Sequence, residues 1–252
     1  VIRGSKIVEK SKHWKMAVTM MHVVVVVLVG IGMVSGVPNV GEMAPDFTAA
    51  AVVNNEIKQV TLSAYRGKWV ALVFYPLDWT FVCPTELLDL SDNMEKFRDL
   101  NTEVLGVSVD SVFSHLAWIE TSREMGGLGG TLNFPLVSDL SRSVSSAYGT
   151  LYGSTGHTLR GTYLIDPHGV VRQLTMNDPP VGRSVAEVLR LLQAFQHADE
   201  TGHVCPSGWS LDNMATIVPD VKKKLEYFET FAADVWNEIQ VGVGGQDCET
   251  TE

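Results

Sequence analysis

One cysteine, Cys83, stands where this chain is best suited to do chemistry. It follows the apolar run 69–75, whose β-branched and aromatic residues predict a buried strand. Pro84 suits the first position of a helix, and Glu86 would lie in its first turn. Apolar residues then recur at the spacing of one amphipathic helix: Leu87, Leu90, Met94 and Phe97. The sequence therefore predicts Cys83 at the N-cap of a helix that follows a buried strand.

A sulfur atom at this position can serve as a nucleophile. The unpaired N–H groups and the positive dipole end of a helix stabilise a thiolate relative to a thiol. The alternative is that Cys83 is a small buried apolar residue, as free cysteines often are. The residues that precede it favour the reactive interpretation, because Pro76 and Thr80 stand seven and three positions before it.

The spacing Pro76-x-x-x-Thr80-x-x-Cys83 resembles the active-site signature of the peroxiredoxins, also called the alkyl hydroperoxide reductase/thiol-specific antioxidant family. The longer run resembles the typical two-cysteine subgroup of the eukaryotic, overoxidation-sensitive type. Segment 203–209, HVCPSGW, resembles the resolving-cysteine segment of that subgroup. The resemblance extends over about residues 38–231, and it implies an α/β, thioredoxin-like fold with a central mixed sheet flanked by helices.

The resemblance also implies a thiol-dependent peroxidase. Cys83 would attack hydrogen peroxide or a small alkyl hydroperoxide and become a sulfenic acid. The Thr80 hydroxyl would contact the peroxide, and Pro76 would screen the sulfur from water. Arg160 would bring a permanent positive charge beside the thiolate, and Glu86 would orient that guanidinium through a bidentate pair.

Each of these residues also has an ordinary structural explanation. Thr80 could cap a helix, Pro76 could form a turn, and Glu86 could interact only with the helix dipole. Either arginine could form a surface ion pair. Arg183, in the matching run 180–184, corresponds to a second arginine near the family's site and is the weaker candidate for direct catalysis.

Cys205 is the expected resolving cysteine. A sulfenic acid condenses with a thiol to a disulfide, which a dithiol carrier then reduces by exchange. The resemblance places this disulfide between two subunits, which implies a homodimer and, commonly in the subgroup, a ring of five dimers. Thioredoxin is the expected reductant, with a disulfide isomerase as the alternative. We expect no cofactor and no metal, and Cys248 matches nothing in the family.

The composition agrees with this interpretation. The chain has 252 residues, of which 45% are hydrophobic, enough for one core of ordinary size. Its net charge of −10 argues against nucleic-acid binding, which needs clustered Lys and Arg. The three cysteines lack C-x-x-C spacing, so the sequence encodes no local zinc site and no thioredoxin-type pair.

The first 37 residues have the pattern of a targeting segment. Basic residues occur up to Lys15, an apolar centre covers 23–34, and small residues follow it. This order is typical of a secretory signal peptide, so we expect the secretory pathway. A membrane anchor is the main alternative, followed by a mitochondrial or cytoplasmic location.

The remaining chain is organised as strands alternating with helices, which predicts an α/β domain. We expect strands at 69–75, 103–109, 134–138, 162–166 and 170–176, and helices after Cys83, at 114–121, 185–202 and 218–236. The predicted organisation is a targeting segment (1–37), a peroxidase domain (38–200), a resolving segment with a helix (201–240) and an acidic tail (241–252).

Two further patterns bear on regulation. Segment 126–129, GGLG, and the pair Tyr227-Phe228 resemble motifs that make some family members prone to overoxidation. They would pack a C-terminal helix over the active site and delay the arrival of Cys205. This permits an additional role as a holdase chaperone. A third hypothesis, a disulfide exchanger without peroxidase activity, is disfavoured by the missing C-x-x-C.

Overall fold

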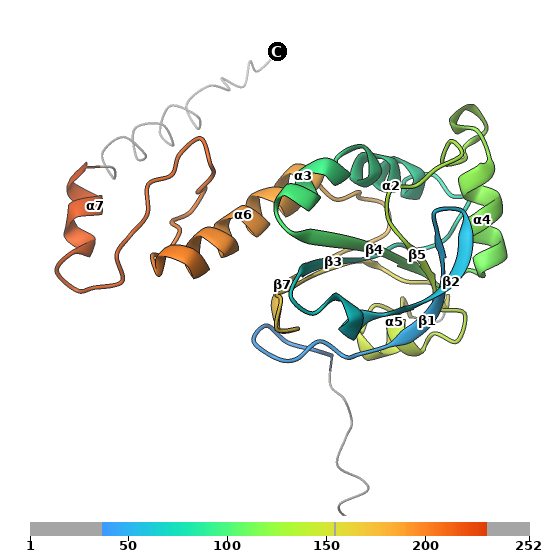
Figure 1. Cartoon of the computed structure of the whole chain (residues 1–252), viewed down its shortest axis with the longest axis horizontal. Coiled ribbons are helices and arrows are strands. Elements are labelled where there is room, and N and C mark those ends of the chain that lie inside the picture. The colour runs from blue at the N-terminus through green and yellow to red at the C-terminus, as the bar shows by residue number, and fades with distance from the viewer. Residues whose placement is uncertain (1–36, 154, 231–252) are drawn as a thin grey trace, which may run out of the picture. The chain divides into compact units, whose positions relative to one another are not determined.

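The computed structural model describes residues 37–153 and 155–230, and Figure 1 shows their arrangement. The chain divides into two units, residues 1–37 and 38–252, and the fold below is that of the second unit. The predicted targeting segment and the acidic tail with Cys248 lie outside the described residues. Within the described ranges, no helix has both the length and the apolar character that a membrane crossing requires.

A mixed sheet of seven strands forms the centre of the fold, in the order β2-β1-β5-β4-β3-β6-β7. Strands β3, β4 and β5 are parallel, and the remaining pairs are antiparallel. The strands are β1 (Thr48–Val53), β2 (Glu56–Thr61), β3 (Trp69–Phe74), β4 (Thr102–Ser108), β5 (Leu136–Ser138), β6 (Arg160–Ile165) and β7 (Val171–Asn177). This arrangement confirms the predicted α/β class with a mixed central sheet.

Helices cover both faces of the sheet (Figure 1). The helices that pack on the sheet are α2 (Cys83–Asp92), α3 (Met94–Asp99), α4 (Val112–Glu120), α5 (Ser143–Ala147) and α6 (Val185–Thr201). A further helix, α7 (Lys224–Thr230), follows, and short 3-10 turns lie at Leu62–Tyr65 and Arg123–Met125. Side chains of β3 alternate between two cores: Trp69, Ala71 and Val73 pack with α2, α3 and α6, whereas Val70, Leu72 and Phe74 pack with α5. All six are buried, so β3 is a central strand.

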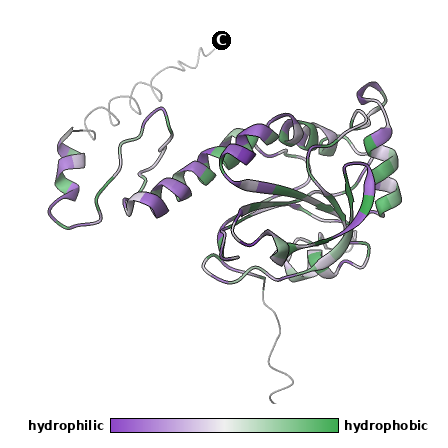
Figure 2. Cartoon of the chain, in the orientation of Figure 1, coloured by the Kyte–Doolittle hydropathy of each residue, from purple (hydrophilic) through white to green (hydrophobic). Residues whose placement is uncertain are grey.

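Helix α6 ends where the sequence predicts. Its C-cap, Gly202, has a φ of 71°, a left-handed conformation that glycine adopts without steric cost. In Figure 2, α6 mixes hydrophilic and hydrophobic residues, and its buried positions Val185, Leu189 and Leu192 form one stripe. This stripe fixes the helix on the sheet.

Two helix predictions are wrong in detail. The residues after Cys83 form two helices, α2 and α3, because the chain breaks at Asn93, whose side chain donates to the Asp89 carbonyl at 2.9 Å. The last helix begins at Lys224 rather than at 218, since residues 219–223 form bends and a turn in which the Asp220 carboxylate accepts the backbone N–H groups of Lys222 and Lys223.

Candidate active site

Cys83 lies at the junction of β3 and α2, as predicted, but it is one residue further into the helix. The N-cap is Val82, and Cys83 is the first helical residue. Val82 has helical dihedral angles, and its carbonyl accepts the N–H groups of Thr85 at 3.0 Å and Glu86 at 3.3 Å. The sulfur therefore stays in the first turn of α2, where the free N–H groups and the positive end of the dipole lie.

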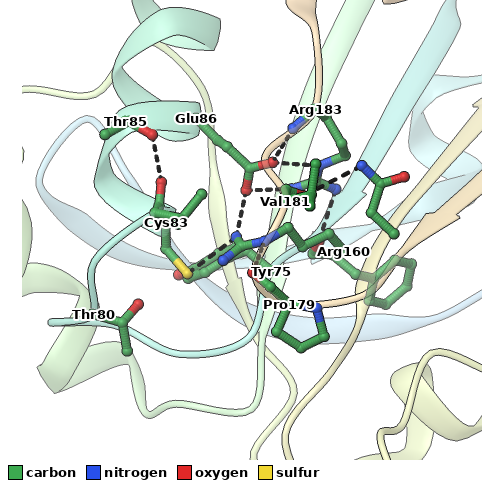
Figure 3. A network of polar contacts seen from close by, with 12 residues as sticks. Tyr75, Thr80, Cys83, Thr85, Glu86, Arg160, Pro179, Val181 and Arg183 are labelled. Atoms are coloured by element: carbon green, nitrogen blue, oxygen red, sulfur yellow. Dashed lines mark hydrogen bonds and ion pairs between the residues drawn. The ribbon is translucent and has the colours of Figure 1, made fainter. Parts of the chain in front are cut away.

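The guanidinium of Arg160 reaches the sulfur from β6, the neighbouring strand of β3. Its Nη1 donates to Cys83 Sγ at 3.4 Å and to Glu86 Oε2 at 2.7 Å, and its Nε donates to the Pro179 carbonyl at 2.7 Å (Figure 3). Cys83, Glu86 and Arg160 are all buried. A thiolate at Cys83 would therefore have a fixed positive charge beside it, shielded from water.

The predicted bidentate pair exists, but Arg183 forms it in place of Arg160. Arg183 Nε donates to Glu86 Oε1 at 2.9 Å, and Nη2 donates to Oε2 at 3.0 Å (Figure 3). Its backbone N–H also donates to Oε1, at 2.8 Å. Arg160 contributes only its Nη1 to Glu86, because its Nε is occupied by Pro179. Glu86 therefore joins two arginines from different elements.

These contacts keep Glu86 ionised although it is buried. Burial alone would raise the pKa of this carboxyl group, but the hydrogen bonds and charge of Arg183, together with the charge of Arg160, lower the pKa below its usual value. Arg183 is itself anchored, since its Nη1 donates to the Phe74 carbonyl at 2.8 Å and to the Gly161 carbonyl at 2.7 Å. Arg183 thus ties the carboxylate to the ends of β3 and β6.

Thr80 and Pro76 line the same cavity as Cys83 and Arg160. Thr80 lies in the loop before α2 rather than at the end of β3, which stops at Phe74. Its hydroxyl donates to the Leu77 carbonyl at 2.8 Å, so the oxygen keeps lone pairs for a further donor. Pro76 is buried beside it. The cavity has a volume of about 300 Å³.

A buried polar network beneath this loop was not predicted. The Asp78 carboxylate accepts from Tyr75 OH at 2.8 Å, Ser114 Oγ at 2.7 Å and His115 Nδ1 at 2.9 Å. The Asp78 backbone N–H donates to Asp110 at 3.0 Å. The network binds the loop to α4 and to the residues after β4, and the next residue, Trp79, has a φ of 59°. Asp78, a charged residue within an otherwise apolar run, is the feature of the sequence that could have predicted this network.

Cys205 lies in the segment after α6. Its Sγ donates to the Ala194 carbonyl at 3.4 Å, and Arg190 Nη1 holds the same segment by donating to the Trp209 carbonyl at 2.7 Å. Burial raises the pKa of the Cys205 thiol, and the positive charge of Arg190 opposes that shift. Both Cys83 and Cys205 are free thiols.

The regulatory motifs occupy defined positions. In segment 126–129, the Gly126 carbonyl accepts from Trp118 Nε1 at 2.8 Å, and a Cβ on Gly127 would clash with the Thr121 carbonyl oxygen. Tyr227 and Phe228 belong to α7. The predicted packing of α7 over the active site stays a prediction. Among the residues that the structure describes, no cluster of His, Cys, Asp or Glu could hold a metal ion.

Comparison with known proteins agrees with this geometry. Residues 40–174 match the model of the AhpC/TSA family. The chain is 57% identical over 196 residues to Peroxiredoxin-2 of Mus musculus, covering 78% of this chain and 98% of that protein. The chain belongs to the peroxiredoxins of the AhpC/TSA family. This peroxiredoxin is therefore a thiol-dependent peroxidase, an oxidoreductase.

Two further comparisons define the subgroup and the fold. Peroxiredoxin-4 of Bos taurus is 52% identical over 190 residues, covering 75% of this chain and 69% of that protein. The reduced 2-Cys peroxiredoxin of Plasmodium vivax superposes with a TM-score of 0.73 at 40% identity, covering 76% of this chain and 98% of that one. The expected two-cysteine subgroup and thioredoxin-like fold are thereby confirmed.

With Cys205 as the expected resolving thiol, its raised pKa predicts a pH dependence for disulfide formation. Because the thiolate is the attacking form, the rate after one equivalent of peroxide should rise with pH and should continue to rise above the ordinary thiol pKa of 9.0. Arg190→Gln should move the rise to higher pH, since it removes the charge that opposes the shift. Quenched-flow alkylation with non-reducing gels measures this rate. A rate that does not change with pH would contradict the prediction.

Proposed function

We propose that this peroxiredoxin reduces hydrogen peroxide and small organic hydroperoxides at Cys83. The observation that carries the proposal is the position of Cys83 Sγ, in the first turn of α2 and 3.4 Å from Arg160 Nη1, in a cavity that Thr80 also lines. The thiolate attacks one peroxide oxygen, the S–O bond forms, and the O–O bond breaks. The departing hydroxide or alkoxide takes a proton, which leaves a sulfenic acid on Cys83.

Several neighbouring groups would stabilise the charge that moves during this step. Arg160 and the N–H groups of α2 face the sulfur, and the Thr80 hydroxyl can accept a hydrogen bond from the peroxide. Glu86 and Arg183 position Arg160 and do not touch the peroxide in this scheme. Pro76 screens the sulfur from water.

Cys205 of a second subunit would complete the cycle. Its thiolate attacks the sulfenic sulfur, an S–S bond forms, and the hydroxyl group leaves as water. A dithiol carrier, thioredoxin or a disulfide isomerase, then reduces the disulfide by exchange. The cycle uses sulfur alone and requires no cofactor. The intersubunit disulfide requires at least a homodimer, and a ring-shaped decamer is the expected assembly.

The cellular setting also stays a proposal. Residues 1–37 would act as a targeting segment for the secretory pathway, with the peroxidase domain at 38–200, the resolving segment and helix at 201–240, and the acidic tail at 241–252. The general role would be peroxide detoxification and redox homeostasis. The holdase chaperone role is kept as an additional prediction that requires overoxidation of Cys83.

A non-reducing gel tests the proposed disulfide. After one equivalent of hydrogen peroxide, the wild-type protein should migrate as a covalent dimer, and both Cys83→Ser and Cys205→Ser should remain monomeric. Cys248→Ser is the matched control and should still form the dimer. A wild-type protein that consumes peroxide without forming a dimer band would exclude Cys205 as the intersubunit resolving thiol.

A further inference from the structure

The cavity beside Cys83 has room for more than hydrogen peroxide. Its volume of about 300 Å³ reaches the lower end of the range of small-molecule pockets, roughly 300–1,000 Å³. Most of its wall is apolar and suits the organic part of a hydroperoxide: Pro76, Leu77, Phe81, Val82, Pro179 and Pro180. The titratable groups in the wall are Cys83, Arg160 and His157. His157 has no role in the reaction proposed above.

His157 is held in a defined orientation. It lies at the end of a short hairpin that the backbone closes, with Tyr152 N–H donating to the His157 carbonyl at 2.8 Å and a bridge between Leu151 and Thr158. Its ring stacks on Tyr152, with 5.4 Å between centroids and 22° between planes. The hairpin is anchored to the active-site loop, because Thr158 Oγ1 donates to the Tyr75 carbonyl at 2.7 Å.

The hydrogen bond of the ring assigns its tautomer. His157 Nδ1 lies 3.0 Å from the Thr158 carbonyl oxygen. A carbonyl oxygen only accepts, so Nδ1 carries the hydrogen, and Nε2 is the nitrogen left to meet a ligand. Within residues 37–153 and 155–230, Nε2 has no hydrogen-bond partner. A neutral ring would present an acceptor at Nε2, whereas a protonated ring would present a charged donor.

None of the described charged groups around His157 binds the N–H of a protonated Nε2, so this N–H is available to an anion. Arg160 contributes a guanidinium to the same cavity, but the Pro179 carbonyl occupies its Nε, and Glu86 and Cys83 share its Nη1, so only Nη2 is left to meet a ligand. On the hairpin side, Arg142 donates its Nε to the Gly156 carbonyl at 2.7 Å. The other titratable groups near the ring are Cys83, which lines the same cavity, and Tyr152, whose ring stacks on it. No carboxylate of the described residues pairs with His157.

We propose that His157 makes this peroxiredoxin selective for organic hydroperoxides that carry a carboxylate, which its protonated Nε2 binds. The proposal deepens the proposed function, since it rests on Cys83 as the group that reacts. The apolar wall holds the carbon chain and strengthens a charged hydrogen bond by excluding water. Because the ring binds a carboxylate in this way only while Nε2 carries a proton, the selectivity is larger in acid than in base.

A matched pair of substrates tests this selectivity. The probes are γ-hydroperoxyisocaproate, a tertiary hydroperoxide with a carboxylate, and its uncharged methyl ester. In the wild-type protein, kcat/KM for the acid should exceed that for the ester about tenfold near pH 6, equivalent to ~1.4 kcal/mol. The ratio should fall toward one as the pH is raised. Ionisation of Cys83 affects both probes equally and cancels in the ratio.

Two variants separate recognition from structure. His157→Asn keeps a side-chain N–H for the Thr158 carbonyl but removes Nε2, so the acid-to-ester ratio should lose its pH dependence. His168→Asn, an exposed histidine in the β6–β7 turn, should keep the wild-type ratio. A wild-type protein that reduces hydrogen peroxide but does not prefer the acid, or a His157→Asn variant with the wild-type ratio, would overturn the proposal. Lack of hydrogen peroxide turnover by the wild type would contradict the proposed function itself.

Discussion

Replacement of Cys83 with serine should reduce peroxide turnover to the uncatalysed background. A serine hydroxyl keeps the position of the sulfur and can accept from Arg160, but it stays protonated at neutral pH and is a poor nucleophile. The measurement is consumption of hydrogen peroxide with an excess of dithiol reductant. The loss should be complete, because the scheme gives no other group the role of attacking the peroxide.

Folding must be separated from chemistry in this experiment. Serine has nearly the shape of cysteine, so the thermal unfolding of Cys83→Ser should stay close to that of the wild type. Cys248→Ser, in the tail outside the described residues, should keep full turnover. Substantial turnover by Cys83→Ser would refute the role of Cys83.

Glu86→Gln should produce the largest loss of stability among single substitutions at the site. The carboxylate is buried and is the counter-charge of both Arg160 and Arg183. Glutamine keeps the shape but leaves two buried guanidinium groups without a counter-charge, which costs about 3–5 kcal/mol when a buried pair is broken. Urea unfolding measures this change, and peroxide reactivity should fall as well because Arg160 loses its orientation.

The pH dependence of this loss has a definite sign. Because the pKa of Glu86 is lowered in the folded state, its ionised form contributes stability above the ordinary glutamate value of 4.5. That contribution is lost as the pH falls through the lower pKa of the folded state. The stability difference between the wild type and Glu86→Gln should therefore shrink on acidification below about pH 4.5.

A surface glutamate provides the control. Glu103 pairs with Lys68 at 2.6 Å, with both side chains partly exposed. Because exposed ion pairs contribute little, Glu103→Gln should cost less than about 1 kcal/mol. If Glu86→Gln were as stable as Glu103→Gln, the claim that the buried carboxylate stabilises the site would be wrong.

Local sequence patterns predicted the fold where burial alone decides the structure. The central strand 69–75 and helix 185–202 were predicted to within a residue because apolar periodicity reports burial directly. The edge hairpin of β1 and β2 was missed. Its strands are largely half-buried or exposed. Its turn depends on Asn54 and Asn55, both with positive φ, a signal that asparagine pairs can give.

The candidate site was predicted less completely, because its contacts join distant parts of the chain. The spacing of Pro76, Thr80 and Cys83 identified the reactive cysteine and its neighbours. Arg160 was identified because its position matches the family pattern. The sequence could not reveal which arginine takes both oxygens of Glu86, since that depends on the Pro179 carbonyl occupying Arg160 Nε. His115, within the apolar helix α4, likewise acquires its role only where the fold brings it to Asp78.

The most direct test of the account is to trap the first oxidised sulfur. The Cys205→Ser variant would be treated with one equivalent of hydrogen peroxide in the presence of dimedone, which captures sulfenic acids, and the adduct would be located by peptide mass spectrometry. We expect one dimedone adduct per chain, on Cys83. An adduct on Cys248, or peroxide consumption with Cys83 unmodified, would contradict it.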